Sequence, residues 1–368
     1  MKILMAADTV GGVWNYSLEL AEALAAHRIT VALATMGREP SPAQIEQVRT
    51  LPNVELYASS YRLEWMEEPW DDLARAGKWL LRLERQLRPD IVHLNNYAHG
   101  ALPWSKPVCT VAHSCVLSWW NAVHHQPAPD CWSRYRVVVA TGIRLSGHLV
   151  APSQAILKML RDIYGSLRSS SVIHNGASAA RFRPAEKWPI VFTAGRLWDK
   201  AKNIEAVIQC AGNLPWRFVI AGEGKSNTKP TANVSLIGHV SPETVAHHMA
   251  IASIYCLPAW YEPFGLSVLE AALSGCALVL GDIDSLRELW NGAAIFVSPD
   301  DHVTLERTLR DLMEDDVSRK TLGELAKARA KCFSTKRMAA SYVDLYKRMM
   351  RVGRTVPKMK RESMIKDS

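Results

Sequence analysis

Short apolar runs alternate with helical patterns along the first half of the chain. The strand candidates Ile3–Ala7 and Ile29–Thr35 flank Trp14–Ala26, in which apolar residues recur at helical spacing. Further strand candidates are Ile91–Leu94, Val108–Ala112 and His148–Ala151, and further helix candidates are Trp79–Leu87 and Gln154–Tyr164. Strands that alternate with helices form βαβ units, whose strands run parallel. The first half therefore predicts an α/β unit on a parallel sheet.

The same alternation starts again after Arg181-Phe-Arg-Pro184, so the boundary between two units is expected near 176–188. Six strand candidates follow, which predicts a second doubly wound sheet: Ile190–Ala194, Arg217–Ala221, Val234–Ile237, Ile254–Leu257, Ala277–Leu280 and Ala294–Val297. Helical patterns are found at Asn203–Gly212, Leu305–Met313, Arg319–Lys331 and Thr335–Met350. A length of 368 residues suits two ordinary domains.

The segment Trp260–Gly275 carries two carboxylates, Glu262 and Glu270, with seven residues between them. A helix that begins at Phe264 or Gly265 would direct free backbone N–H groups and its positive dipole end at a ligand, which suits a phosphate. Carboxylates accept hydrogen bonds from ligand hydroxyls. Phosphates and hydroxyls together indicate a sugar nucleotide.

The polar side chains on that helix form one narrow stripe. Between Gly265 and Ser274 they are Ser267, Glu270 and Ser274, at positions i, i+3 and i+7. The stripe faces either bulk water or a cleft, and the pattern alone leaves both readings open.

Two further groups of residues follow predicted strands, where doubly wound sheets bind ligands. Gly11 and Gly12 form either a loop that a phosphate or sugar can approach or a plain tight turn. This loop lacks the full G-x-G-x-x-G of a dinucleotide site. Arg196 and Lys202 are cations suited to a diphosphate, and Lys200 is the alternative to Lys202. Without a ligand site nearby, they would be ordinary surface cations.

His113 ends the run Val108–Ala112, and Asn95 and Asn96 follow Ile91–Leu94. A lone histidine at a strand end is most often structural. Asn95 and Asn96 are weaker candidates for the ligand cleft at the strand ends.

The literal strings resemble the retaining glycosyltransferases of family four, which have the GT-B fold and an E-x7-E signature. Besides the segment at Trp260, the matching strings occur in the family's order: Met1–Gly12, Val111–His113, Leu149–Ser153, Val172–Gly176, Ala194–Leu197 followed by Lys202, and Ala221–Gly224. The resemblance implies two Rossmann-like domains facing across a cleft. The expected parts are an acceptor-binding domain over 1–180, a nucleotide-sugar domain over 185–332, a last helix over 335–350 that completes the first domain, and a basic tail over 351–368.

The resemblance also assigns roles. It implies transfer of a sugar from a nucleotide diphosphate sugar to an acceptor hydroxyl, with retention, by front-face attack. Glu262 and His113 would contact the donor sugar, Arg196 and Lys202 the pyrophosphate, and Glu270 the ribose hydroxyls. Backbone amides at Phe264, Gly265 and Leu266 would bind sugar and phosphate, and the loop at Gly11 and Gly12 would lie beside the leaving diphosphate and the acceptor.

No cofactor and no essential metal are expected. Asp282-Ile-Asp284 looks like the D-x-D of metal-dependent glycosyltransferases, but Asp284 or Ser285 fits better as a helix N-cap. Two other functions remain open. A sugar-nucleotide epimerase of the same fold would need an acid/base pair that is not identified here, and a non-catalytic sugar-nucleotide-binding protein would not need intact Glu262, Arg196 and His113.

Charge is concentrated at the end of the chain. The net charge is +8, and residues 347–368 hold eight Lys and Arg against two acidic residues. A near-neutral body argues against nucleic-acid binding, while the tail suits contact with an anionic membrane or is simply solvated. No apolar run is long enough to span a bilayer. Seven cysteines without a C-x-x-C pair make a disulfide framework or zinc site unlikely. We therefore expect a cytoplasmic protein, which the basic tail would place at the inner face of the membrane.

An aromatic segment broken by prolines is the candidate for acceptor selection, because the resemblance implies that the first domain binds the acceptor, and aromatic faces often pack on sugars. The alternative is a loop packing on its own domain. Its members are Trp119, Trp120, His124, His125, Pro127, Pro129, Trp132 and Tyr135.

Overall fold

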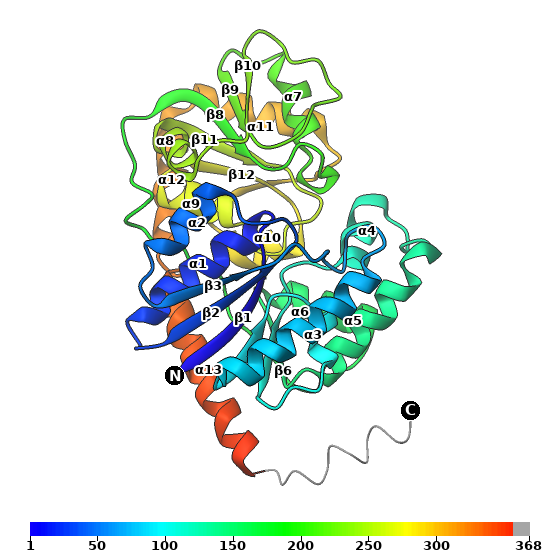
Figure 1. The fold of residues 1–368 in the computed structure, drawn as a ribbon. Helices are drawn as coiled ribbons and strands as arrows, with labels where there is room; N and C mark the ends of the chain where they lie inside the picture. Colours follow the sequence, from blue (N-terminus) through cyan, green and yellow to red (C-terminus); the bar gives the residue numbers. More distant parts are fainter. Residues whose placement is uncertain (356–368) are drawn as a thin grey trace.

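The computed structural model describes residues 1–355, which form two parallel sheets with helices on both faces (Figure 1). This arrangement confirms the predicted fold class. The tail beyond residue 355 lies outside the described residues, and with it most of the predicted basic segment. No helix among residues 1–355 is long and apolar enough to cross a membrane.

The first sheet has seven strands in the order β3-β2-β1-β4-β5-β6-β7. The interior strand β1 is buried from Ile3 to Ala7, which explains the continuous apolar run. The strands are β1 (Lys2–Asp8), β2 (Thr30–Met36), β3 (Val54–Ala58), β4 (Ile91–Leu94), β5 (Val108–Val111), β6 (His148–Ala151) and β7 (Ser170–Val172).

The second sheet has the six strands that the sequence predicts, in the order β10-β9-β8-β11-β12-β13. In both sheets the strand order reverses beside the first strand, and ligands of doubly wound folds bind at that reversal. The strands are β8 (Trp188–Ala194), β9 (Arg217–Ala221), β10 (Val234–Gly238), β11 (Ala252–Leu257), β12 (Ala277–Gly281) and β13 (Ile295–Val297).

The helices that cover the first sheet are α1 (Gly12–Ala25), α2 (Pro42–Arg49), α3 (Trp70–Leu87), α4 (Val116–His124), α5 (Ser133–Leu145) and α6 (Gln154–Tyr164). Those of the second half are α7 (Ile204–Ala211), α8 (Pro242–Ile251), α9 (Leu266–Leu273), α10 (Asp284–Trp290), α11 (His302–Glu314) and α12 (Asp316–Ala330). Three short 3₁₀ helices lie in connections: η1 (Ala98–Ala101), η2 (Asp130–Trp132) and η3 (Lys200–Lys202).

The last helix, α13 (Thr335–Thr355), follows α12 of the second half but packs beside α1 and β1 of the first (Figure 1). Its Tyr342 and Tyr346 are fully buried in the same apolar cluster as Ile3 and Met5. The Tyr16 hydroxyl donates a hydrogen bond to the Tyr342 hydroxyl at 2.6 Å, which ties α1 to α13. The first sheet is therefore covered on one face by a helix from the far end of the chain.

Candidate functional site

The β1–α1 loop lies against the second domain, opposite the end of β8. Gly11 has a φ of 76°, and a Cβ atom there would lie 3.1 Å from Arg196 Nη1. A Cβ atom on Gly12 would lie 3.8 Å from Leu266 Cδ1, at the start of α9. The structure thus brings together residues predicted from three separate motifs, Gly11 and Gly12, Arg196, and Leu266.

Glu262 is held by two hydrogen bonds, one to each carboxylate oxygen. Lys202 Nζ donates to Oε2 at 2.7 Å, and the backbone N–H of Gly265 donates to Oε1 at 2.9 Å. Lys202 and Glu262 expose only 17% and 12% of their side chains, so this ion pair is largely shielded from water. Lys200, the alternative cation, is exposed to solvent.

The loop that carries Glu262 is anchored to both domains. Ser285 Oγ, from α10, donates to the Glu262 carbonyl at 2.6 Å, and Ser153 Oγ, which precedes α6, donates to the Pro263 carbonyl at 3.1 Å. Phe264 is buried in the apolar core of the second domain. Gly265 takes a left-handed conformation, with φ 82°, so that α9 can begin at Leu266. The free N–H groups at the start of α9 therefore lie beside Glu262.

Glu270 lies one turn further along α9 and faces the first domain. Burial raises its pKa to about 8, the nearby Glu19 of α1 raises it further, and Arg181 opposes this. The other members of the polar stripe do not face bulk water, since Ser267 accepts a hydrogen bond from the Tyr255 hydroxyl and Ser274 is fully buried. The stripe therefore faces the interior and the junction between the domains.

Arg196 is oriented by Asp199, a residue that the sequence analysis did not single out. Arg196 Nη2 donates to Asp199 Oδ2 at 2.8 Å, while Trp119 Nε1 of α4 donates to Asp199 Oδ1 at 2.9 Å across the domains. Burial opposes ionisation of Asp199, but Lys202 and Arg196 outweigh it and hold its pKa below the usual value. The spacing of Asp199, three residues after Arg196 and three before Lys202, is the signal that could have indicated it.

His113 follows β5 and is joined to the strand β4 beside it. Its Nε2 lies 2.8 Å from Asn95 Oδ1, and its ring packs edge-on against Tyr16 at 4.4 Å between centroids. Burial lowers the pKa of His113 to about 3, with the nearby His93 lowering it further, so the ring is neutral. Asn96 points elsewhere, to His99.

Asp8 is a second carboxylate that the sequence analysis missed. It ends β1, and its Oδ1 accepts a hydrogen bond from the Val10 N–H at 3.2 Å. Burial raises the pKa of Asp8 to about 7, the Val10 N–H and Arg196 lower it, and Glu64 raises it. The signal that could have indicated Asp8 is its place at the carboxyl end of the interior strand β1.

Asp282 and Asp284 do not form a metal site with each other in the described chain. Arg287 binds both carboxylate oxygens of Asp282, through Nε and Nη2. The predicted N-cap was wrong: Ile283 is the N-cap of α10, and no side chain caps its first turn, because Ser285 Oγ is used by the Glu262 carbonyl. No group of three or more His, Cys, Asp or Glu side chains is placed to hold a metal within residues 1–355.

The aromatic segment after β5 packs within its own domain and also reaches the second one. Besides the bond from Trp119 to Asp199, the Tyr135 hydroxyl accepts a hydrogen bond from the Val116 N–H, and the tilted rings of Trp120 and His124 lie 4.5 Å apart between centroids. The Ser118 and Tyr261 hydroxyls are 2.9 Å apart, which joins this segment to the residue before Glu262.

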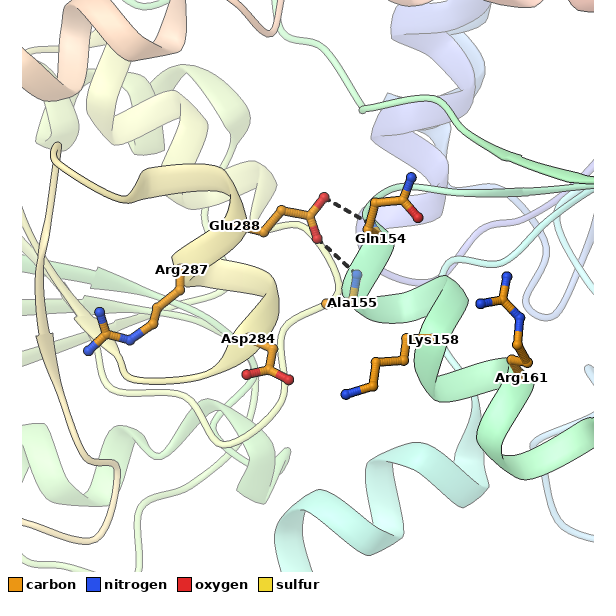
Figure 2. Close-up of a pocket in the computed structure, with 7 residues that line it drawn as sticks. All are labelled: Gln154, Ala155, Lys158, Arg161, Asp284, Arg287 and Glu288. Atoms are coloured by element: carbon orange, nitrogen blue, oxygen red, sulfur yellow. Dashed lines mark hydrogen bonds between the residues drawn. The ribbon is translucent and has the colours of Figure 1, made fainter.

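A pocket of about 430 Å³ lies between α6 and α10 and contains none of the predicted site residues (Figure 2). Glu288 of α10 reaches across it and accepts hydrogen bonds from the Gln154 and Ala155 N–H groups, each at 2.8 Å. These bonds cap the start of α6 from the other domain. The pocket therefore marks a junction between the domains rather than the predicted site.

Comparison with known proteins gives consecutive matches along the chain. Residues 10–181 match the family model Glycosyltransferase Family 4, and residues 177–329 match Glycosyl transferases group 1. A glycogen synthase of Mycobacterium tuberculosis is 26% identical over 89% of this chain and 90% of its own length. The O-antigen chain mannosyltransferase B of Escherichia coli is 21% identical over 79% of this chain and 66% of its own length.

Solved structures share the fold. Sucrose-phosphate synthase from Thermosynechococcus elongatus superposes with a TM-score of 0.80 at 18% identity, covering 96% of this chain and 100% of that chain. Anabaena HepE in complex with UDP and glucose superposes with a TM-score of 0.73 at 16% identity, covering 94% and 99%.

Proposed function

Because this chain belongs to the glycosyltransferases of the GT-B fold, we propose that it moves a sugar from a nucleotide diphosphate sugar to an acceptor hydroxyl with retention of anomeric configuration. The observation that carries the proposal is the arrangement around Glu262. Its carboxylate is held by Lys202 and the Gly265 N–H at the start of α9, while Arg196 and the Gly11 loop lie at the same junction.

The leaving diphosphate is stabilised by cations and backbone N–H groups. Arg196 and Lys202 supply positive charge from one side, and the first turn of α9 adds free N–H groups. The absence of a side chain at Gly11 leaves the backbone open to the phosphates beside Arg196. In the free protein Asp199 and Glu262 hold the two cations in place until a diphosphate binds.

Glu262 orients the sugar and does not attack it. Both of its oxygens already accept hydrogen bonds, which lowers their nucleophilicity, so a covalent glycosyl-enzyme is disfavoured. The acceptor hydroxyl then attacks the anomeric carbon on the side from which the diphosphate leaves, and its proton passes to the departing phosphate. Glu270 binds the ribose hydroxyls, and His113 binds the transferred sugar.

No metal takes part in this proposal, because Arg196, Lys202 and the start of α9 neutralise the diphosphate. Chelation with EDTA should therefore leave the rate of transfer unchanged. Loss of transfer in EDTA, restored by Mg²⁺ or Mn²⁺, would overturn this and make Asp282 and Asp284 the candidate metal ligands.

The acceptor belongs to a growing polysaccharide, glycolipid or other glycoconjugate. The M. tuberculosis relative is named a glycogen synthase and the E. coli relative an O-antigen chain mannosyltransferase, and both names support acceptors of this kind. The basic residues from Lys347 onward would draw the protein to an anionic membrane, at about 1 kcal/mol for each nearby cation. Truncation after Arg351 should reduce co-sedimentation with anionic vesicles, and equal binding by both forms would rule this out.

A thermal-shift screen against UDP, GDP, ADP and their sugars tests the proposed donor class. A ligand at a hundred times its dissociation constant stabilises the folded state by about 2.7 kcal/mol. We expect one nucleotide series to shift the unfolding midpoint, because HepE, of the same fold, binds UDP in its solved complex. No shift with any nucleotide diphosphate or its sugars would contradict the proposal.

A further inference from the structure

A chain of buried hydrogen bonds runs from His113 to the C-terminal helix. Asn95 Oδ1 lies 2.8 Å from His113 Nε2 and 3.2 Å from His93 Nε2, and His93 Nδ1 lies 2.6 Å from the Tyr346 hydroxyl. His93 and Tyr346 are fully buried, and Asn95 is nearly so. The chain therefore connects β5, β4 and α13 without passing through water.

The orientation of the Asn95 amide is determined by Ser17. The Ser17 hydroxyl donates its hydrogen to the Val13 carbonyl at 2.7 Å, so its oxygen can only accept from Asn95 Nδ2, 3.3 Å away. The amide nitrogen must face Ser17, and the amide oxygen must face both imidazoles.

An amide oxygen only accepts hydrogen bonds, so both imidazoles must donate from Nε2. Burial lowers the pKa of His93 to about 4 and that of His113 to about 3, so each neutral ring carries one N–H. His93 Nδ1 is then bare and accepts from the Tyr346 hydroxyl. His113 Nδ1 is bare as well, and no group within residues 1–355 donates a hydrogen bond to it.

We propose that Asn95, His93 and Tyr346 are positioning residues for sugar transfer, since together they hold His113 as the Nε2–H tautomer with Nδ1 as a hydrogen-bond acceptor. His113 is partly exposed and packs against Tyr16 of α1, so this nitrogen is available to a ligand. It accepts from a hydroxyl of the transferred sugar and cannot serve as a proton donor. That role rests on the proposed function, whereas the tautomer does not.

The same chain gives the C-terminal helix a part in the active site. Tyr346 is the only described residue of α13 with a hydrogen bond to the chain that ends at His113. Tyr342, one turn earlier, is equally buried but bonds to Tyr16 instead. Two matched tyrosines on one helix thus differ in whether they reach His113 through hydrogen bonds.

The tautomer is tested first, on the protein without any ligand. Histidine labelled with ¹⁵N gives ring-nitrogen shifts that distinguish protonated from bare nitrogens, with His93→Asn and His113→Asn used for assignment. We expect both rings to be protonated at Nε2 and bare at Nδ1. Protonation of His113 at Nδ1, or a charged ring at neutral pH, would overturn the inference and leave the proposed function standing.

The coupling is tested with Tyr346→Phe against Tyr342→Phe. Each removes one buried hydroxyl from α13, so a purely structural effect is shared by both variants. We expect Tyr346→Phe to change the His93 ring shifts and to lower kcat roughly ten-fold, with little change in donor KM, because His113 loses its fixed orientation. Tyr342→Phe should leave the His93 ring shifts unchanged and should reduce kcat less than Tyr346→Phe does.

Equal effects of the two tyrosine variants on kcat would overturn the coupling. Asn95→Asp and Asn95→Leu supply a second, independent comparison, because aspartate keeps the acceptor oxygen and leucine removes it. Nε2 protonation of His113 should persist in Asn95→Asp. Its persistence to the same degree in a folded Asn95→Leu would contradict the role of Asn95.

Discussion

At the scale of single residues, the two cations of the site are each paired with a carboxylate. Arg196 is paired with Asp199, and Lys202 is paired with Glu262. Shielding such a pair from water is costly, and removal of one partner is costlier still because it leaves an uncompensated charge. Both cations are therefore fixed in position, as the proposed stabilisation of a leaving group requires.

Replacement of Lys202 by methionine should lower the rate of transfer roughly ten- to a hundred-fold, since a charged hydrogen bond is worth about 1.5–3 kcal/mol. Lys200→Met is the matched control, because Lys200 lies in the same 3₁₀ helix but is exposed and has no ion pair among the described residues. Steady-state kinetics on both variants decide between the two lysines. A larger loss in Lys200→Met would transfer the role to Lys200.

Glu270 should destabilise the fold at alkaline pH. Its folded-state pKa of about 8 lies above the ordinary value of 4.5, so the folded state binds its proton more tightly than the unfolded state. Stability is therefore lost as the pH rises from about 4.5 through 8, at about 1.4 kcal/mol for each pKa unit. Because the side chain is partly exposed, we expect the free energy of unfolding of Glu270→Gln to exceed that of the parent by only roughly 1–3 kcal/mol at pH 8.

Thermal unfolding of the parent and Glu270→Gln at pH 5 and pH 8 measures this effect. The variant should match the parent near pH 5 and unfold at a higher temperature at pH 8. Equal midpoints at both values of pH would show that the Glu270 carboxyl is already ionised in the fold at neutral pH.

At the scale of elements, the site is made by the turns that follow β1, β8 and β11. These turns carry Gly11, Arg196 and Glu262, and each stands at the carboxyl end of a parallel strand. In the β1–α1 turn a side chain at position 11 would meet the Arg196 guanidinium, since a Cβ atom on Gly11 would lie 3.1 Å from Arg196 Nη1.

Gly11→Ala should therefore impair both folding and transfer, while Gly292→Ala should impair folding alone. Both glycines have a φ of 76°, which costs an alanine roughly 1–2 kcal/mol, but a Cβ atom on Gly292 meets nothing within 4 Å. Midpoints of thermal unfolding and rates of transfer for the two variants separate the backbone effect from the contact with Arg196. Parent-like transfer by Gly11→Ala would argue that this turn does not border the reacting groups.

The sequence analysis missed two strands of the first sheet, β3 and β7. Strands β4, β6 and β9 have the predicted bounds, because both of their faces are buried. Strand β3 has a half-exposed pattern, and β7 is only three residues, Ser170–Val172, so neither shows an apolar run. Both lie at the edges of the first sheet, where burial no longer dictates the residue type.

The sequence could indicate candidate-site residues that share a short motif, as Glu262 and Glu270 do. Asp8, Asp199 and the chain through His93 and Tyr346 were not, since each depends on groups far apart in the sequence. Tyr346 is 253 positions from His93, and only the return of α13 to the first sheet brings them together.

At the scale of the whole molecule, the domains are joined by polar contacts that surround the site. Arg181 of the connecting segment binds Glu19 and Glu22 of α1, and Ser153 binds the Pro263 carbonyl. Glu288 caps α6 from α10. Apolar packing adds to these bonds, since Ala201 and Tyr261 of the second half belong to an apolar cluster of the first domain.

Glu288→Gln should lower the unfolding midpoint, because the carboxylate complements the positive end of α6 and an amide offers only one acceptor oxygen. The expected loss is about 1–2 kcal/mol. Glu324→Gln, at an exposed position on α12, is the matched control and should unfold as the parent does. A midpoint for Glu288→Gln equal to that of the control would mean that this contact does not stabilise the domain junction.

The most direct test of the account compares Glu262→Gln with the parent in two assays, nucleotide affinity by calorimetry and sugar transfer by steady-state kinetics. Glutamine keeps the shape of the side chain but loses the charge that pairs with Lys202. The account predicts nucleotide affinity close to that of the parent and transfer reduced roughly ten- to a hundred-fold, because Glu262 acts on the sugar rather than on the nucleotide. Transfer by Glu262→Gln at the parent rate would contradict the assignment of the active site to this junction.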